Sequence, residues 1–397
     1  MVKIRVARTA EIPDPLRISR YRKIPELGPR ILFFSGGSAL NGLCNTLKNY
    51  THNSIHLVTP FDSGGSSAEL RQAFAMPSIG DLRSRLMALA DETVLGHPEV
   101  YELFTYRFPK DRSNKELRSR LEIMASGKSE RVADITNPMR RLICNQLGYF
   151  MDAMPDSFDL RGASIGNLIL AGGYLNNHQH LDPIIFLFSK LVNVQGTVRA
   201  IVNEDLHLGA DLADGCRVIG QHRLTGKEVP PLDLAIEKLF LSENRDSYAP
   251  AIAQLKKKNR KLIEAAELIC YPPGSFYSSL MANLLPAGVG RAIAGNDCPK
   301  VYIPNLGADP EQVGMNFEQM VGGLITQLQS DVPGGCSNNK LLNLVLVDSR
   351  NGRYPSNVSA RFLKRLGIEL VDVKLISKQS TPYYDNDLLV SAILSLT

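Results

Sequence analysis

The sequence has no tryptophan and no pair of cysteines at metal-binding spacing. Its six cysteines stand singly at positions 44, 144, 216, 270, 298 and 336, which excludes a CxxC zinc or redox motif. No apolar run approaches the roughly 20 residues of a membrane-spanning helix, and residues 1–16 lack the apolar core of a secretory signal. We therefore expect a cytoplasmic protein with reduced cysteines and no membrane partner.

The chain also has little excess of one charge over the other. The net charge is +5 over 397 residues, with 44% apolar and 21% charged residues, as in ordinary globular proteins. The dense basic run at residues 256–261 lies on an expected helix without nearby aromatic residues. A solvated helix face accounts for such a run, so we predict no nucleic-acid partner.

What the sequence does contain is a repeated alternation of short apolar runs, glycine-rich turns and helical segments. Continuous apolar runs are typical of strands buried on both faces of a parallel sheet. We expect such strands at residues 31–34, 55–58, 268–271, 301–303, 344–347 and 370–373. Helices are expected at residues 39–48, 68–74, 81–90, 139–151, 164–175 and 183–191. The pattern predicts an α/β protein with a doubly wound, mainly parallel sheet.

Two stretches interrupt this alternation. Residues 92–135 are richer in charge, and residues 139–192 are densely helical and apolar. They predict a helical insertion at about residues 92–192 within a single α/β domain of residues 29–397. Residues 1–28 are interpreted as an N-terminal extension on the surface, and residues 221–231 as a polar connector.

The first expected strand ends in the glycine-rich turn Ser35-Gly36-Gly37-Ser38. A turn of this kind exposes N–H groups at a helix N-terminus, where anions bind, and glycine lets a phosphate approach the backbone. Ser38 either caps the helix or donates to the ligand. The spacing is not GxGxxG, so an NAD site is not indicated; an ordinary turn is the alternative interpretation.

The second expected strand is followed by a loop that combines Asp62, Gly64, Gly65, Ser66 and Ser67. Loops at this position line the crevice of open α/β sheets. Asp62 is a candidate ligand of Mg²⁺ or of a substrate hydroxyl. Ser66 or Ser67 could cap the next helix, but capping would account for only one of these serines.

Two helix starts carry further candidates. Asp81 either complements a helix N-terminus or faces a ligand, and Arg83 beside it is a candidate fork for phosphate or carboxylate. Ser164 and Asn167 either face a ligand or belong to a buried helix in which Gly166 permits close packing.

A late strand leads into residues 272–279, which contain Gly274, Ser275 and Tyr277. Their prolines, glycine and hydroxyl groups predict a second anion cradle at a helix N-terminus. Two such loops on one sheet indicate a ligand with separated phosphates, or with a phosphate and a second polar end.

Metal-binding clusters are not evident. His178 and His180 are two residues apart, which places them on different sides of a helix, and no third ligand stands near. Asp205, Asp211 and Asp214 form either a carboxylate cluster or, as we favour, an acidic surface loop.

Taken in order, these loops resemble the CofD/YvcK superfamily. The matching segments are residues 35–40, 62–71, 77–90, 162–171, 272–285 and 302–311. The N-terminal extension and the insertion are similar to the CofD-related branch found in GAK gene clusters. The resemblance implies a Rossmann-like fold with its ligand at the C-terminal edge of the sheet, and it adds Asn305 of the last segment to the candidate ligand-binding residues.

The resemblance implies one of two functions. CofD proteins transfer a phospholactyl group from a nucleoside-diphosphate carrier to a deazaflavin hydroxyl with Mg²⁺, whereas YvcK proteins look like UDP-sugar-binding regulators. This chain departs from the family at Ser63, where a second Asp is expected, and at Ala163, where a His is expected. We expect a transferase with Asp62 and Arg83 as catalytic residues and Asp62 as metal ligand; the alternative is a non-catalytic nucleotide-binding regulator. By analogy with the family, we expect a homo-oligomer.

Overall fold

The computed structural model describes residues 9–226, 229–307 and 309–397. Residues 1–8 of the expected N-terminal extension and residues 227–228 of the expected connector lie outside the described residues, as does residue 308 of the last matching segment.

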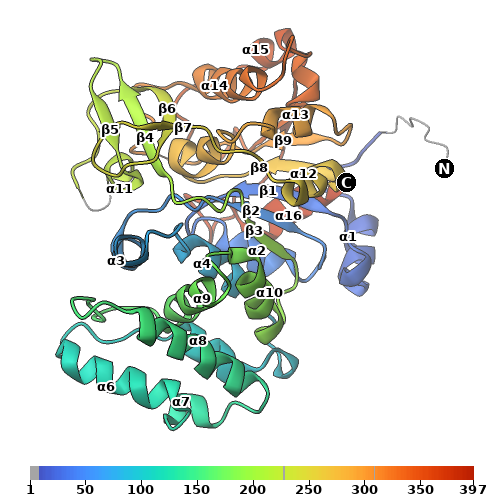
Figure 1. Ribbon diagram of the computed structural model, residues 1–397. Coiled ribbons are helices and arrows are strands. Elements are labelled where there is room, and N and C mark those ends of the chain that lie inside the picture. Colours follow the sequence, from blue (N-terminus) through green and yellow to red (C-terminus); the bar gives the residue numbers. More distant parts are fainter. Residues whose placement is uncertain (1–8, 227–228, 308) are drawn as a thin grey trace.

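The centre of the molecule is a seven-stranded sheet (Figure 1). Its order is β11-β10-β9-β8-β1-β2-β3, and every neighbouring pair within it is parallel. The strands are β1 (Ile31–Ser35), β2 (Ile55–Val58), β3 (Thr197–Ala200), β8 (Leu268–Tyr271), β9 (Lys300–Tyr302), β10 (Leu344–Val347) and β11 (Glu369–Asp372). The predicted α/β fold with a parallel sheet is confirmed, and all six predicted strands are present.

Strand β1 shows why the apolar runs form this sheet. Ile31 and Phe33 belong to one core cluster, and Leu32 and Phe34 belong to another, as the alternation of side chains along a strand requires. All four are fully buried because helices cover both faces. Strand β3 was missed in the sequence because, as an edge strand, it alternates buried with half-buried residues.

The order of the strands reverses between β1 and β8. From β1 the chain moves outward through β2 and β3, and from β8 it moves the other way through β9, β10 and β11. In open α/β sheets, the crevice beyond the carboxyl ends of the strands at such a switch point is where ligands bind.

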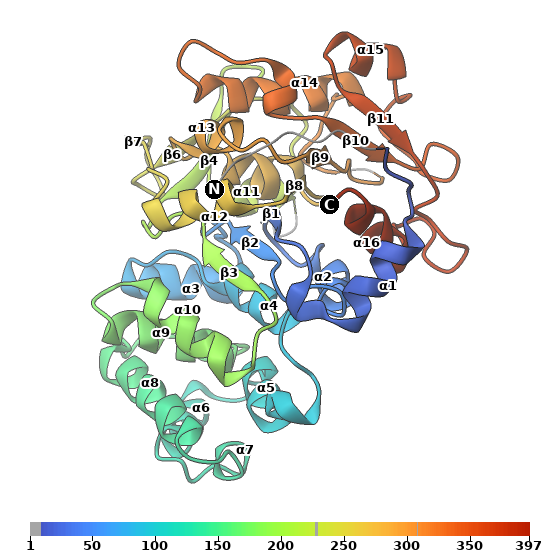
Figure 2. The same ribbon diagram turned by 90° about the vertical axis from the view of Figure 1, so that its right-hand side faces the viewer.

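Helices form the remaining layers (Figures 1 and 2). The helices are α1 (Pro15–Lys23), α2 (Asn41–Leu47), α3 (Gly65–Phe74), α4 (Gly80–Ala88), α5 (Pro98–Thr105), α6 (Asn114–Ala125), α7 (Glu130–Ala133), α8 (Met139–Ala153), α9 (Ile165–Asn176), α10 (Leu181–Leu191), α11 (Gln221–Thr225), α12 (Lys257–Ala265), α13 (Val289–Ala294), α14 (Phe317–Ser330), α15 (Ala360–Arg365) and α16 (Asn386–Ser395). Short helical turns are η1 (Pro25–Leu27), η2 (Val94–Gly96), η3 (Phe276–Met281, a π-helical turn) and η4 (Asn338–Lys340). Helices α2, α4 and α16 contribute to the core on one face of the sheet, and α12, α13 and α14 to the core on the other. No helix in the described ranges is long and apolar enough to span a membrane.

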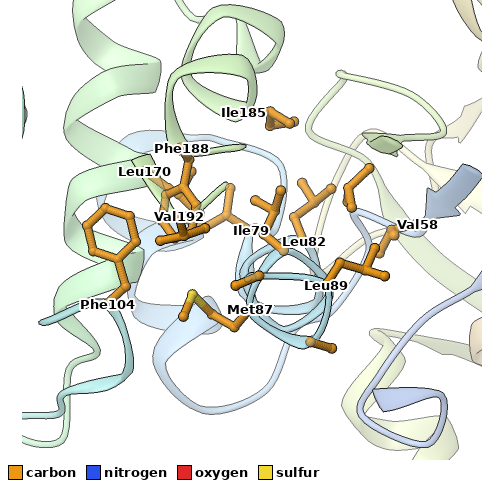
Figure 3. Close-up of a cluster of buried hydrophobic side chains, with 14 of the residues drawn as sticks. Val58, Ile79, Leu82, Met87, Leu89, Phe104, Leu170, Ile185, Phe188 and Val192 are labelled. Carbon is orange, nitrogen blue, oxygen red and sulfur yellow. The ribbon is translucent and has the colours of Figure 1, made fainter. Parts of the chain in front are cut away.

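Helices α3 to α10 all lie in the connection between β2 and β3, and α6, α7 and α8 form its outermost part (Figure 1). The connection is joined to the sheet by a continuous apolar core, part of which Figure 3 shows. There Leu82 of α4 and Leu170 of α9 pack in one cluster with Val58 of β2, and the rings of Phe104 and Phe188 lie 4.1 Å apart. Because the helices share this close-packed core, they are held in a fixed position relative to that face of the sheet.

A second, antiparallel sheet was not predicted. It has the order β5-β4-β6-β7 and consists of β4 (His207–Leu212), β5 (Arg217–Ile219), β6 (Ile236–Ser242) and β7 (Pro250–Ala251). The interpretation of residues 205–214 as an acidic surface loop is therefore wrong for β4, which is mostly buried. Glycine weakens a strand signal, but Gly209 is needed here because a Cβ would lie 2.4 Å from the Phe240 ring.

Candidate functional site

A cleft of about 560 Å³ opens at the carboxyl edge of the sheet, where the strand order reverses. The predicted site residues that line it are Gly36, Gly37, Ser38, Asp62, Gly64, Gly65, Ser66, Ser67, Asp81, Arg83, Asn167 and Ser275. These residues come from loops after β1, β2 and β8 and from the starts of α3, α4 and α9. The tertiary structure therefore brings most of the separately identified loops into one place.

The turn after β1 packs closely against its neighbours. A Cβ on Gly36 would lie 2.6 Å from Thr59 Oγ1 and 3.0 Å from Ser279 Oγ, so only glycine fits between the loops after β2 and β8. The N-cap residue of α2 is Leu40, and no side chain caps the helix. The suggestion that Ser38 caps α2 is therefore wrong; Ser38 lies on the cleft wall instead.

The N-termini of α3 and α4 meet at the cleft. The N-cap residues are Gly64 and Ile79, and neither provides a side-chain hydrogen bond to its helix. Ser66 and Ser67 lie inside the first turn of α3, so the suggestion that one of them caps this helix is wrong. A Cβ on Gly80 would lie 2.5 Å from Ser67 Oγ. Two positive helix-dipole ends therefore point at one small volume, which favours an anion there.

Two carboxylates line the same cleft. Asp62 Oδ1 accepts a hydrogen bond of 3.1 Å from the N–H of Gly64, and its Oδ2 would lie 3.4 Å from a Cβ on Gly80. Asp81 Oδ2 would lie 3.3 Å from a Cβ on Gly36. Among the described residues, no group of three or more histidine, cysteine or carboxylate side chains could hold a metal. A pair of carboxylates beside a phosphate site does fit Mg²⁺, which is usually held by one or two carboxylates together with the phosphates of a ligand.

Arg83 and Arg107 give the cleft its positive charge. In the described part of the chain, neither guanidinium has a carboxylate within ion-pairing distance; Arg83 makes one long hydrogen bond, 3.4 Å to the Phe104 carbonyl, and its Nε has no partner. Burial, together with the nearby charge of Arg107, lowers the pKa of Arg83 to about 10. An anionic ligand would relieve this repulsion.

A third arginine, Arg85, lies beneath the first loop and is fully buried. It donates hydrogen bonds to the Gly37 carbonyl at 3.3 Å, to Asn41 Oδ1 at 3.2 Å and to Cys44 Sγ at 3.0 Å. It is not one of the site residues that the sequence predicts. Its charge reinforces the positive potential of the cleft because little water screens it.

The start of α9 also faces the cleft. Asn167 is almost completely buried and donates from Nδ2 to Ser66 Oγ at 3.2 Å, while its Oδ1 has no partner among the described residues. Ser164 does not line the cleft but an adjoining pocket, and its Oγ also lacks a partner among those residues. Buried polar atoms without partners are rare in proteins, so both atoms are candidates for contact with a ligand.

Besides Ser164, four predicted residues lie outside the cleft lining. Ser35 is buried at the end of β1, where its carbonyl accepts hydrogen bonds from the Thr59 N–H and from Asn283 Nδ2. Gly274 stands behind the first loop, with its Cβ position 3.8 Å from the Ala39 Cβ. Asn305 is half-buried in the loop after β9. The fourth residue is Tyr277.

Ser275 and Ser279 of the second predicted cradle line the cleft, but the N–H groups around Tyr277 are not open to a ligand. The N–H groups of Tyr277 and Ser278 donate to Glu311 Oε2 at 3.0 and 2.7 Å, and the N–H of Phe276 donates to Asp309 Oδ2 at 2.9 Å. The cradle predicted at residues 272–279 thus holds the protein's own carboxylates, and the prediction that these N–H groups bind an external anion is wrong. Burial and the neighbouring Asp309 raise the pKa of Glu311 to about 7.

Sequence reasoning missed part of the cleft wall. The missed residues are Ala39, Gly80, Ser84, Arg107, Gln221, His222, Thr225 and Ser279. Ser63, which stands where the related family has an aspartate, pairs with His222: its Oγ lies 2.8 Å from Nδ1 and accepts the His222 N–H at 3.1 Å. The sequence pattern predicts a polar connector at residues 221–231. No local feature of this segment indicates that α11 packs beside a loop 159 residues earlier in the chain.

Comparisons with known proteins agree with this architecture. The family model described as 2-phospho-L-lactate transferase CofD matches residues 31–377. The gluconeogenesis factor of Bacillus subtilis is 26% identical over 91% of this chain and 93% of its own length. A relative from Nostoc is 29% identical over 82% of this chain, which spans 56% of that relative's length. The crystal structure of a UPF0052 family protein from Bacillus halodurans has the same fold, with a TM-score of 0.67 and 23% identity over 92% of this chain and 99% of that one.

Proposed function

Because the chain belongs to the CofD family, we propose that its cleft binds the diphosphate of a nucleoside-diphosphate-type ligand and transfers a phosphorus-linked group from it to a hydroxyl acceptor. The observation that supports this most directly is the convergence of the N-termini of α3 and α4, whose N-cap residues supply no side-chain hydrogen bond, with Arg83 and Arg107. Helix N-termini and guanidinium groups are the usual protein partners of phosphate. The cleft volume of about 560 Å³ lies within the range of small-molecule sites.

The chemistry follows from where the charges lie. The acceptor oxygen would form a new bond to phosphorus, the bond from that phosphorus to the bridging oxygen would break, and a nucleoside monophosphate would leave. Asp62 would orient the acceptor hydroxyl and take its proton. Arg83 and the N–H groups at the start of α3 would stabilise the charge that develops on the phosphate oxygens.

The cleft also fits a divalent cation. Asp62 and Asp81 would hold Mg²⁺ together with the phosphates of the ligand, and the ion would neutralise part of the phosphate charge. Because the ligand itself completes such a site, a cluster of three protein carboxylates is not required.

A second function is favoured by one contact. Ser63 is bound to His222 and supplies no second carboxylate next to Asp62, and similar proteins are named gluconeogenesis factors. On this alternative, the cleft binds a nucleotide or UDP-sugar without transferring any group, and the protein is a regulator.

A thermal-shift panel of GDP, GTP, UDP-sugars and deazaflavins, with and without Mg²⁺, tests the shared premise. A ligand at 100 times its Kd should add about 2.7 kcal/mol to stability. If no nucleotide raises the melting temperature, both functions are refuted.

Phosphorus NMR of the bound nucleotide with candidate acceptors then separates the two functions. The transferase should produce a nucleoside monophosphate, and Asp62→Asn should abolish its formation. Asp134→Asn, at an exposed position on the outer helices, is the matched control and should leave it unchanged. Binding without a new phosphorus signal would favour the regulator, and unchanged turnover in Asp62→Asn would contradict the role of Asp62.

A further inference from the structure

A second cavity, of about 340 Å³, adjoins the cleft; we call it the side pocket. It shares Gly65, Ser66, Arg107 and Asn167 with the cleft, so the two volumes have a common wall. Arg107 and Ser164, both on its wall, face each other in an isolated antiparallel bridge, next to which the Phe108 N–H donates to the Ala163 carbonyl at 2.9 Å. The loops at residues 107–110 and 158–164 and the starts of α3 and α9 therefore surround a space beside the glycine-rich loops of the cleft.

The charge on this pocket is positive and partly unpaired. Arg161 is neutralised by Asp159, whose carboxylate accepts its Nη2–H at 2.8 Å. Arg107 and Lys110 have no carboxylate within ion-pairing distance among the residues that the structure describes; Arg107 bonds only to the Gly162 carbonyl, at 3.2 Å. The remaining carboxylate on the wall, Glu69, is exposed to solvent, as Arg107 and Lys110 are, and among the described residues it forms an ion pair with neither of them. Two cations are thus left for an anionic ligand.

The interior of the pocket combines polar and apolar groups. Ser164 is fully buried on its wall, and its Oγ has no hydrogen-bond partner among the described residues. Asn167 Oδ1, on the wall shared with the cleft, is also buried and has no hydrogen-bond partner among these residues. Leu70, Phe158 and Leu168 supply apolar surface, and Ala163 lies where the related family has a histidine, which leaves this wall small and neutral. Such a mixture is typical of a small-molecule site.

We propose that the side pocket binds the acceptor, and that this acceptor is an anionic small molecule whose carboxylate or phosphate group is held by Lys110 and Arg107. The inference rests on the proposed function of the cleft. Ser164 and Asn167 would bond to the polar body of the acceptor, which places its reactive hydroxyl at the wall shared with the cleft. Lys110 lines the side pocket and not the cleft, so it should discriminate acceptors without affecting the nucleotide.

The test is calorimetric titration of the full-length protein with the cleft saturated by GDP or UDP, whichever raises its melting temperature. Inorganic phosphate and succinate are the two probes, and they distinguish a phosphate-bearing from a carboxylate-bearing acceptor. We expect one of them to bind the nucleotide-loaded protein. Lys110→Gln should weaken that binding at least about tenfold, because the loss of a hydrogen bond to a charged group changes affinity by this factor or more. The affinity for the nucleotide should stay unchanged.

Lys115→Gln is the matched control, since Lys115 is exposed on α6 and does not line the pocket. It should bind both probes as the wild type does. If neither probe binds the nucleotide-loaded protein at millimolar concentration, or if Lys110→Gln binds as well as the wild type, the inference is overturned and the proposed function survives. If no nucleotide binds at all, the proposed function fails and the inference fails with it.

Discussion

Replacement of Arg71 by methionine should destabilise the protein strongly, because this side chain joins the Asp62 loop to the antiparallel sheet. The Arg71 side chain is 4% exposed, and its Nε and Nη2 donate to Asp205 Oδ1 at 3.1 and 2.6 Å. It also donates to the carbonyls of Phe61 and Asp62, both at 3.3 Å, and of Leu206 at 2.8 Å. Its Nη2 also lies 3.2 Å from His207 Nδ1. Methionine keeps the apolar stem and removes all six of these hydrogen bonds.

The expected loss follows from the burial of the pair. Breaking a buried ion pair by removing one partner costs about 3–5 kcal/mol, because the abandoned carbonyls stay buried and Asp205, 24% exposed, is left without its counter-ion. Unfolding entropy near 2.1 cal/mol/K per residue gives roughly 0.8 kcal/mol/K for 397 residues. The melting temperature of Arg71→Met should therefore fall by about 4–6 °C, and nucleotide affinity should fall as well because the Asp62 carbonyl loses its anchor.

Differential scanning calorimetry with and without nucleotide measures both effects. Arg245→Met is the matched control, because Arg245 is exposed on the same side of the molecule and, among the described residues, its side chain makes one hydrogen bond, a long one of 3.5 Å to Gln72 Oε1. It should shift the melting temperature by less than about 1 °C, as surface changes of under 0.5 kcal/mol do. If Arg71→Met shifts it no more than the control, the anchoring role is refuted.

Three further predictions concern the cleft and the buried titratable groups. Gly36→Ala should weaken nucleotide binding at least about tenfold and cost about 1–3 kcal/mol, because its Cβ would lie 2.6 Å from Thr59 Oγ1; Gly148→Ala, where nothing lies within 4 Å, should do neither in the same titration and melting experiments. The pKa of Glu311 is raised from 4.5 to about 7, so the folded state binds more protons and stability should fall as the pH rises through this window; Glu311→Gln should flatten that part of the curve of melting temperature against pH. Burial and the charge of Arg71 lower the pKa of His207 from 6.5 to about 4, so the unfolded state binds more protons between these values and stability should fall as the pH falls from 6.5 toward 4. His207→Asn should reduce this loss of stability in acid. An unchanged slope of melting temperature against pH in this variant would contradict the assignment.

Much of the main sheet was predictable because the signal is local. A continuous apolar run such as residues 31–34 identifies a strand buried on both faces wherever it occurs, and glycines at the following turn mark a close approach. The antiparallel sheet was not predictable in this way. Its strand β4 contains Gly209 and Asp211, which weaken any strand pattern, and it is stabilised by pairing with β6 and by cross-strand contacts such as the ion pair of Asp211 with Arg217 at 2.6 Å.

The candidate site likewise contains residues that local sequence identifies and residues that only tertiary packing brings to it. The loops at residues 35–38 and 62–67 were identifiable because their residue types are chemically specific, and their order along the chain indicated the family that the family-model match confirms. The wall formed by Arg107 and His222 was not identifiable, since neither residue belongs to a motif and each reaches the cleft through an element that packs there only in the folded protein. The same holds for Arg85, whose burial beneath the first loop is a consequence of packing.

By itself, the sequence determined the parallel α/β architecture and the glycine-rich loops at the ends of its strands, because backbone periodicity and local residue type suffice for both. Only the tertiary structure decided which loop is open to a ligand. The segment at residues 272–279 has the composition of an anion cradle, but Glu311 supplies the anion from within the chain, whereas Arg83 and Arg107 lack a carboxylate partner among the described residues. Whether a charge is already neutralised depends on contacts between distant residues, and residue type alone does not reveal it.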